Sequence, residues 1–323
     1  MRIHANDGIS ANGKASLENA GFIVSTNSVP QEGLITFLTK ENVDVLLVRS
    51  ATKVPKELID ACPNVRLIGR GGVGLDNIDV AHAKSRGIPV INTPGASSIS
   101  VAEMVLAHLS GLMRGLHQSN RLMPTNGATG FKDLKKRFGK GRELRGSTLG
   151  IIGFGRIGQW TARYALGCGM EVIYADHSCA IDSIEMPLGG STVTASVERV
   201  AVDELLARAD AISLHVPKQP DGAPVLGRAE LAKVKPGAFI INTARGGSVD
   251  EDALLAALAA GRIAGAALDV FVGEPEPRTD VLAAEGLSLS PHIGAATVEA
   301  QARIGDELAE QIIAWSKASV SQG

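Results

Sequence analysis

Short apolar runs along the chain alternate with longer segments in which apolar residues recur at helical spacing. In the first third, five such runs are candidate strands, at residues 3–5, 22–25, 43–49, 67–69 and 89–92. Segments of helical period lie between them, for example 55–61 and 80–86. Strands that alternate with helices predict a parallel α/β fold.

The same alternation resumes after an interruption. An apolar helix is expected at 101–116, where Ser100 and Glu103 have the spacing of a capping box. Residues 119–147 are rich in Gly, Lys and Arg, show no sustained period and predict a long connection. A last helix is expected at 298–315. Six further strands are expected at 149–153, 172–175, 211–216, 238–242, 265–269 and 287–290, enough for a doubly wound dinucleotide-binding sheet.

Composition narrows the class of protein. The 323 residues are 45% hydrophobic and 20% charged, which is typical of a soluble globular protein with room for two domains. The net charge of −2 gives no reason to expect a nucleic-acid partner. Without a signal-like N-terminus or a membrane-length apolar run, we expect a cytoplasmic protein with no membrane partner. Cys62, Cys168 and Cys179 lack CxxC spacing, so we expect reduced thiols and no metal site.

A glycine-rich loop follows one of the expected strands. In "TLGIIGFGRIGQW", Gly153 permits a tight turn, Gly155 admits a pyrophosphate and Gly158 lets helix and strand pack closely. The helix N-terminus that begins there offers free N–H groups to phosphates. Asp176 ends the next strand and can accept both ribose hydroxyls, which favours NAD over NADP. The alternative is an ordinary glycine-rich turn followed by an exposed aspartate.

Three residues with functional side chains follow successive strands in the last third of the chain. Arg245 comes after "AFIIN", Glu274 after "AALDVFVG" and His292 after "LSLSP". Because the carboxyl ends of parallel strands share one edge of a sheet, these side chains can converge there. Taken singly, the arginine could cap a helix, the glutamate could be a solvated loop acid, and the histidine could be a satisfied core residue.

The three residue types suit the oxidation of a hydroxyl group. Histidine can take or return the hydroxyl proton near neutral pH, and a neighbouring carboxylate such as Glu274 favours its protonated form. The Arg245 guanidinium offers paired donors to a carboxylate. We therefore interpret the trio as catalytic residues acting on a small hydroxy acid.

The chain resembles the D-isomer-specific 2-hydroxyacid dehydrogenases, and among them most the D-3-phosphoglycerate dehydrogenases. The resemblance runs nearly end to end and rests on seven ordered motifs: "LLVRSATKV", "GRGGVGLDNID", "INTPGASSISVAE", "LGIIGFGRIG", "INTARGGSVDEDAL", "AGAALDVFVGEP" and "SPHIGAAT". It implies that Arg245, Glu274 and His292 are catalytic. It also implies a Rossmann doubly wound sheet, residues 98–293, inserted in a flavodoxin-like substrate domain made of residues 1–97 and 294–323.

The resemblance further implies which residues contact the ligands. Arg156, Ile157 and Asp176 would hold the pyrophosphate and ribose of NAD. The remaining cofactor contacts would be His215, Val216, Pro217, Thr243, Ala244, Asp269, Gly294 and Ala295. The "GGVG" loop can form an anion nest, and its residues Gly72, Val73 and Gly74 would hold the substrate carboxylate. Asp76 and Asn77 are expected to be structural.

A phosphorylated substrate requires positive charge beyond Arg245. Arg49, followed by Ser50, matches an arginine of the phosphate region in the phosphoglycerate branch. Lys135, Lys136, Arg137 and Lys140 form either a solvated face or a basic stretch that such homodimers lend to the neighbouring subunit. Ser97 replaces the usual asparagine at the expected domain crossing. Since the chain ends after its closing helix, we expect no feedback by serine through a C-terminal regulatory domain.

The leading hypothesis is therefore the NAD-dependent conversion of 3-phospho-D-glycerate to 3-phosphohydroxypyruvate, a step of serine biosynthesis, by a homodimer. A reductase of hydroxypyruvate, glyoxylate or another 2-oxo acid is the alternative. A formate dehydrogenase fits less well, because that branch pairs its histidine with glutamine. A protein of another class, an NAD(H)-sensing corepressor-like protein, would carry long tails and a peptide cleft, and neither is evident.

Overall fold

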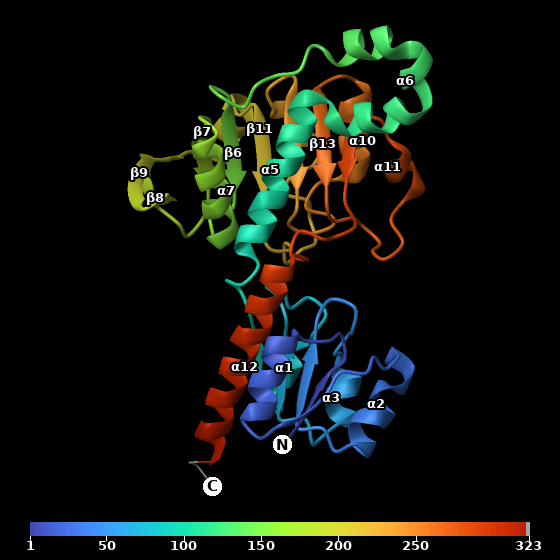
Figure 1. Ribbon diagram of the computed structural model, residues 1–323, viewed down its shortest axis with the longest axis vertical. Coiled ribbons are helices and arrows are strands. Elements are labelled where there is room, and N and C mark those ends of the chain that lie inside the picture. Colours follow the sequence, from blue (N-terminus) through green and yellow to red (C-terminus); the bar gives the residue numbers. More distant parts are fainter. Residues whose placement is uncertain (321–323) are drawn as a thin grey trace. The chain divides into compact units, whose positions relative to one another are not determined.

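The computed structural model describes residues 1–320, which divide into two compact units (Figure 1). One unit joins residues 1–98 to the segment that begins at residue 295. The other contains residues 99–294. Each unit has its own parallel sheet and is described by itself.

The smaller unit contains a five-stranded parallel sheet in the order β2-β1-β3-β4-β5, the flavodoxin-like order. Its strands are β1 (Arg2–Ala5), β2 (Ile23–Ser25), β3 (Val45–Val48), β4 (Leu67–Arg70) and β5 (Val90–Asn92). Its helices are α1 (Ala11–Asn19), α2 (Gln31–Lys40), α3 (Lys56–Ala61), α4 (Val80–Ser85) and α12 (Val298–Val320).

Both faces of this small sheet are buried, as the alternation along β3 illustrates. Val45 and Leu47 pack with residues of α1 and α12, whereas Leu46 and Val48 pack with residues of α2 and α3. A parallel strand that is covered on both sides is expected to be apolar throughout, which explains the run "VLLV". The C-terminal helix thus completes the fold of the N-terminal residues.

The larger unit contains a seven-stranded parallel sheet in the order β10-β7-β6-β11-β12-β13-β14, a Rossmann-type doubly wound arrangement. Its strands are β6 (Thr148–Ile152), β7 (Glu171–Ala175), β10 (Glu198–Arg199), β11 (Ala211–Leu214), β12 (Ala238–Asn242), β13 (Ile263–Leu268) and β14 (Leu287–Leu289). An antiparallel hairpin adds β8 (Ser183–Leu188) and β9 (Ser191–Ser196).

Helices cover both faces of the larger sheet (Figure 1). They are α5 (Ser98–Arg114), α7 (Arg156–Gly167), α8 (Val202–Arg208), α9 (Arg228–Lys233), α10 (Glu251–Ala259) and α11 (Thr279–Ala283). The remaining helix of this unit, α6 (Leu116–Phe138), has no buried residue among those that the structure describes. Along β12, Phe239 and Ile241 pack with α5 and α7, while Ala238 and Ile240 pack with α8, α9 and α10. The predicted α/β class with parallel sheets is confirmed.

Two sequence-based expectations were wrong, and one strand of the larger sheet was not expected. The helix α5 begins at Ser98, so Ser100 lies within its first turn and is no cap, and the Glu103 carboxylate instead accepts from the Tyr164 hydroxyl at 3.1 Å. Most of the expected connection at 119–147 is helical, because α6 continues to Phe138 with non-helical geometry only at Gly130. The expected six strands are joined by a short seventh, β10.

Among the described residues, no single helix is both long and apolar enough to cross a membrane. The bent pair α5 and α6, at 61° to each other, meets that criterion only by combined length and composition.

Candidate active site

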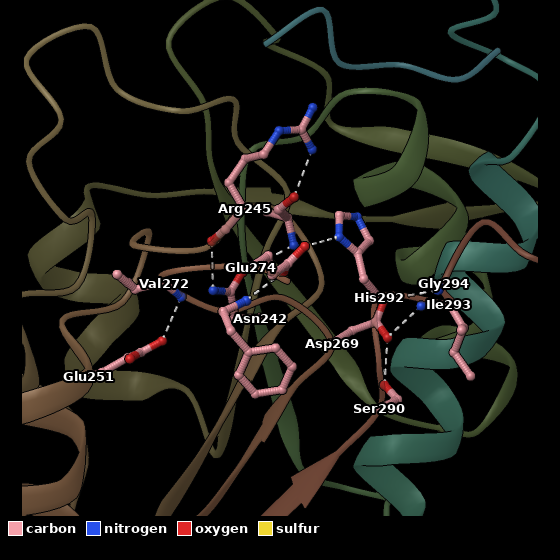
Figure 2. A network of polar contacts seen from close by, with 12 residues as sticks. Asn242, Arg245, Glu251, Asp269, Val272, Glu274, Ser290, His292, Ile293 and Gly294 are labelled. Carbon is pink, nitrogen blue, oxygen red and sulfur yellow. Dashed lines mark hydrogen bonds and ion pairs between the residues drawn. The ribbon is translucent and has the colours of Figure 1, made fainter. Parts of the chain in front are cut away.

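Neighbouring strands β12, β13 and β14 deliver the polar residues of the larger unit to one edge of its sheet. They end at Asn242, Leu268 and Leu289, and Arg245, Glu274 and His292 lie in the loops that follow them. Figure 2 shows these loops meeting at the carboxyl ends of the strands. This is the edge at which open α/β sheets bind their ligands.

His292 and Glu274 form a direct pair. The Nδ1 atom of His292 lies 2.6 Å from Glu274 Oε2, and Glu274 Oε1 accepts from the backbone N–H of Phe271 at 2.8 Å (Figure 2). Because an ionised carboxylate only accepts, Nδ1 is the protonated ring nitrogen in this contact. The Nε2 atom is then available for proton exchange, and the His292 side chain remains 44% exposed.

The loop that presents His292 is fixed by a buried carboxylate. Asp269 Oδ1 accepts from Ser290 Oγ at 2.6 Å and from Ile293 N at 2.9 Å, and Oδ2 accepts from Gly294 N at 2.8 Å. His292 itself has φ +54°, a left-handed conformation that is unusual for a side chain of its size. The two Asp269 bonds to the amides that follow hold the chain in this turn.

A second histidine supports the same loop from α5. His108 Nε2 lies 3.0 Å from Ser290 Oγ, and its Nδ1 lies 2.9 Å from Ser288 Oγ. Since the Ser290 hydroxyl donates to Asp269, His108 Nε2 must donate to Ser290. Burial lowers the pKa of His108, which is consistent with this neutral form. No local motif pointed to His108 or Ser290, because 182 residues separate them.

The Arg245 loop is held by Asn242, the last residue of β12. The Asn242 side chain accepts from Ala244 N at 3.0 Å and donates to Arg245 O at 3.0 Å. The Arg245 guanidinium donates through Nη1 to Ala244 O at 2.7 Å. A Cβ on Gly246 would lie 1.9 Å from Phe271 O, so only glycine allows this loop to approach the one after β13 so closely.

The glycine loop between β6 and α7 has the geometry that a dinucleotide requires. A Cβ on Gly153, which has φ +92°, would lie 2.5 Å from His215 O, and one on Gly158 would lie 2.3 Å from Gly153 O. By contrast, nothing lies within 4 Å of a Cβ position at Gly155, so the helix N-terminus is open to a phosphate there. Arg156 and Ile157 begin α7 directly after it.

Asp176 lies directly after β7, next to this loop. Its Oδ2 atom accepts from Phe154 N at 2.6 Å, and its Oδ1 atom accepts from Ser178 N at 2.8 Å and Cys179 N at 2.7 Å. Burial opposes ionisation, but the hydrogen bonds from Cys179, Phe154 and Ser178 together lower the pKa of Asp176. The carboxylate is therefore charged and held at the carboxyl end of β7.

Two other residues expected at the cofactor have buried polar atoms without a hydrogen-bond partner among the described residues, namely Thr243 Oγ1 and His215 Nδ1. His215 Nε2 lies 2.9 Å from Ser213 Oγ, and burial lowers the pKa of His215 to about 3, so its ring is neutral. Buried polar atoms normally find partners, so these two fit a site that a cofactor completes. Val216 and Pro217 continue this loop, after the end of β11.

The residues expected to bind substrate in the smaller unit follow β3 and β4. Arg49 and Ser50 follow β3, while Gly72, Val73 and Gly74 follow β4. Gly72 has φ +134° and donates its N–H to Thr93 Oγ1 at 2.8 Å, which leaves Val73 and Gly74 as the candidate anion nest. Ala295, expected at the cofactor, begins the second segment of this unit.

Arg70 was not singled out from the sequence. A Cβ on Gly72 would lie 1.9 Å from Arg70 Nη1, so the guanidinium covers this glycine. A Cβ on Gly71 would lie 3.4 Å from Arg49 Cγ. Two arginine side chains therefore flank the same glycine loop.

Comparison with known proteins identifies the family. Residues 106–294 match the family model for the NAD binding domain of D-isomer specific 2-hydroxyacid dehydrogenases. The chain belongs to this family. It is an NAD-dependent dehydrogenase that acts on CH–OH groups, and the predicted family, enzyme class and cofactor are confirmed.

Individual relatives differ in substrate. A hydroxypyruvate reductase from Thermotoga maritima is 41% identical over 96% of this chain and 97% of its own length. A D-3-phosphoglycerate dehydrogenase from Methanocaldococcus jannaschii is 41% identical over 92% of this chain, which spans only 54% of that protein. The structure of an Aquifex aeolicus D-lactate dehydrogenase complexed with NAD and lactic acid matches with a TM-score of 0.77 and 26% identity, covering 100% of this chain and 97% of that one.

Proposed function

We propose that this dehydrogenase interconverts 3-phospho-D-glycerate and 3-phosphohydroxypyruvate, a step that leads toward serine. The observation that supports this substrate is the pair of arginine side chains beside residues 71–72: the Arg70 guanidinium lies against Gly72, and the Arg49 side chain passes Gly71 at its Cγ. A 2-hydroxy acid without phosphate carries one carboxylate, for which one guanidinium, that of Arg245, suffices. A phosphate adds close to two negative charges, and arginines are its preferred protein partners.

We propose roles for the trio in the oxidation of the hydroxyl carbon. Bound NAD supplies the acceptor for the hydride that leaves this carbon. His292 Nε2 takes the hydroxyl proton, and Glu274, at 2.6 Å from Nδ1, stabilises the imidazolium that forms. Arg245 binds the substrate carboxylate and keeps the carbon in place. In the reverse direction, His292 returns the proton to the carbonyl oxygen.

The test is a comparison of catalytic efficiency, kcat/KM, with phosphorylated and unphosphorylated substrates. With NADH, 3-phosphohydroxypyruvate should be reduced about 100-fold more efficiently than hydroxypyruvate, since each charge-assisted bond contributes about 1.5–3 kcal/mol. Arg49→Ala should remove most of this preference, whereas Arg66→Ala, before the opposite end of β4, should preserve it. Equal efficiencies for the two substrates would reject the phosphate assignment.

Reduction of hydroxypyruvate is the second candidate function. It is favoured by the Thermotoga maritima hydroxypyruvate reductase, because that relative matches this chain over almost its whole length. The same assay decides between the two, since a hydroxypyruvate reductase would show the higher efficiency with the unphosphorylated acid and little effect of Arg49→Ala.

A further inference from the structure

Residues 49–52 form the turn after β3, and a single carboxylate binds its N–H groups. Asp7, two residues beyond the end of β1, accepts from Arg49 N at 2.6 Å and from Thr52 N at 3.1 Å through Oδ2. Its Oδ1 atom accepts from the Thr52 hydroxyl at 2.6 Å. Three donors of one turn therefore converge on one charged group, an arrangement in which hydrogen bonds are strong.

The carbonyl groups of the same two residues are bound from another element. Asn77, in the loop that leads to α4, donates through Nδ2 to Arg49 O at 2.7 Å and to Thr52 O at 2.6 Å. Both ends of the turn thus have their N–H groups bound by Asp7 and their C=O groups bound by Asn77. This fixes the backbone at both ends of the turn while Ser50 and Ala51 stay exposed.

A buried polar chain supports this arrangement from β1. Asn6 Nδ2 donates to Thr52 Oγ1 at 2.7 Å, and Asn6 Oδ1 accepts from Val29 N at 2.9 Å. That amide orientation makes His4 Nε2, 3.1 Å from Asn6 Oδ1, the donor, and His4 Nδ1 lies 2.9 Å from the Ser25 hydroxyl. A buried network in which every member is satisfied holds one conformation.

The turn bears the arginine to which the proposed function assigns the phosphate. Arg49 packs its side chain against Gly71, and the neighbouring strand β4 leads into the Gly72–Gly74 loop. A binding group held in its productive position before the ligand arrives loses less conformational entropy on binding. We propose that Asp7 and Asn77 are positioning residues that hold the turn 49–52 for substrate binding. This positioning role rests on the proposed function only in one respect, namely that the turn 49–52 lies at the bound substrate.

The experiment uses the full-length enzyme and whichever 2-oxo acid it reduces best. Asp7→Asn leaves one oxygen for three donors, and Asn77→Asp sets a carboxylate against two carbonyl oxygens. Each should raise KM about tenfold or more, because Asp7→Asn loses hydrogen bonds to a charged group and Asn77→Asp loses two hydrogen bonds at once. The Kd of NADH should stay within about twofold, because the expected cofactor residues of the glycine loop lie in the other unit, and kcat should change much less than KM.

Asp44→Asn is the matched control. Asp44 also binds a backbone N–H through its carboxylate, that of Arg2 at 2.7 Å, but at the opposite edge of the same sheet. Its KM should equal that of the wild type. Thr52→Ser keeps the hydroxyl and should have the KM of the wild type, whereas Thr52→Val should have a higher KM. If Asp7→Asn does not fold, these two variants test the positioning role in its place.

Hydrogen exchange gives a readout that does not depend on substrate. The amides of Arg49 and Thr52 should lose protection in Asp7→Asn and keep it in Asp44→Asn. Folded Asp7→Asn and Thr52→Val enzymes with a wild-type KM would overturn the positioning role, as would an equal rise of KM in Asp44→Asn. Equal efficiency with phosphorylated and plain substrates would instead reject only the phosphate assignment.

Discussion

Two histidines at the carboxyl edge of the larger sheet differ in their surroundings. His292 is partly exposed and bonded to the Glu274 carboxylate, so its second ring nitrogen is available for a substrate proton. His215 is partly buried, with its Nδ1 atom out of contact with solvent, and burial lowers its pKa to about 3, so it stays neutral near pH 7. A ring that does not titrate near neutrality can donate or accept a hydrogen bond but is a poor proton carrier. We therefore expect His292 to transfer the proton and His215 only to bind.

The proton-transfer role of His292 can be tested by substitution. His292→Asn should lower kcat by about 100- to 10,000-fold, the usual contribution of general acid–base catalysis, with little change in the Kd of NADH. Glu274→Gln keeps a hydrogen bond but loses the charge and should lower kcat less. Steady-state kinetics and NADH fluorescence titration measure both quantities. Glu276→Gln, in the same loop, is the control, and a kcat within threefold of wild type for His292→Asn would contradict the role.

His215 should also make the stability of the larger unit depend on pH. In the folded state its ring stays neutral down to about pH 3, while the unfolded chain binds a proton below about pH 6.5. Between these values the unfolded state holds more protons, so stability falls as pH falls. From pH 6.5 to pH 5 the loss should be about 2 kcal/mol. In urea unfolding, the free energy of unfolding of His215→Gln should fall less than that of the wild type over this range. An equal fall in the two proteins would contradict a neutral buried ring.

At the scale of elements, two glycines set the packing of α1 against α12. The two helices lie side by side in the smaller unit (Figure 1). A Cβ on Gly13 would lie 2.6 Å from Gly305 O, and a Cβ on Gly305 would lie 2.0 Å from Ser10 Oγ. The atoms that would clash with a Cβ are the backbone of Gly305 in the first case and the side chain of Ser10, the N-cap of α1, in the second. Neither glycine can therefore be replaced without moving a helix.

This packing predicts opposite effects for two similar substitutions. Gly13→Ala should destabilise the smaller unit by about 1–3 kcal/mol, because overpacking forces the backbone apart. Gly33→Ala, in the first turn of α2, meets only Val29 Cγ1 at 3.7 Å and should stabilise by about 0.5 kcal/mol through helix propensity. Chemical unfolding of the two variants measures both changes. A neutral Gly13→Ala would show that the helices do not need this close approach.

Most elements with a buried side could be predicted from the sequence, although the hairpin strand β8, which buries Ile184 and Met186, was not. The eleven expected strands all occur, with ends within two residues of those expected, because burial on both faces makes most of them apolar runs. None of the described side chains of α6 is buried, so no apolar period marks it, and Pro124, Gly127 and Gly130 argued against a helix. The strand β10 has only two residues, both exposed.

The same distinction applies to the candidate site. Arg245, Glu274 and His292 could be proposed because parallel strands bring their ends together, whatever the sequence between them. The link from Asp269 through Ser290 to His108 could not, because it joins a loop to a helix 182 residues away and each residue is unremarkable alone. The turn clamped by Asp7 and Asn77 likewise depends on contacts between distant residues.

At the scale of the whole molecule, α6 stands out because it adds nothing to the core of the unit to which it belongs. It has 23 residues, none of those described is buried, and its apolar side chains Leu116, Met123 and Phe131 are 62%, 44% and 57% exposed. A large exposed apolar patch usually marks an interaction surface, and three such side chains on one helix make α6 a candidate for one. The family resemblance implies a homodimer, and we propose that α6 contributes to its interface.

This interface can be tested by adding charge to α6. Sedimentation should give a dimer for the wild type and a monomer for the double variant Met123→Glu/Phe131→Glu at the same micromolar concentration, because burying two unpaired carboxylates is unfavourable. Leu188→Glu is the matched control, since Leu188 is 50% exposed but lies on the hairpin strand β8. It should remain a dimer. A dimeric double variant would place the interface elsewhere, and a monomeric wild type would leave the exposed face of α6 to another partner.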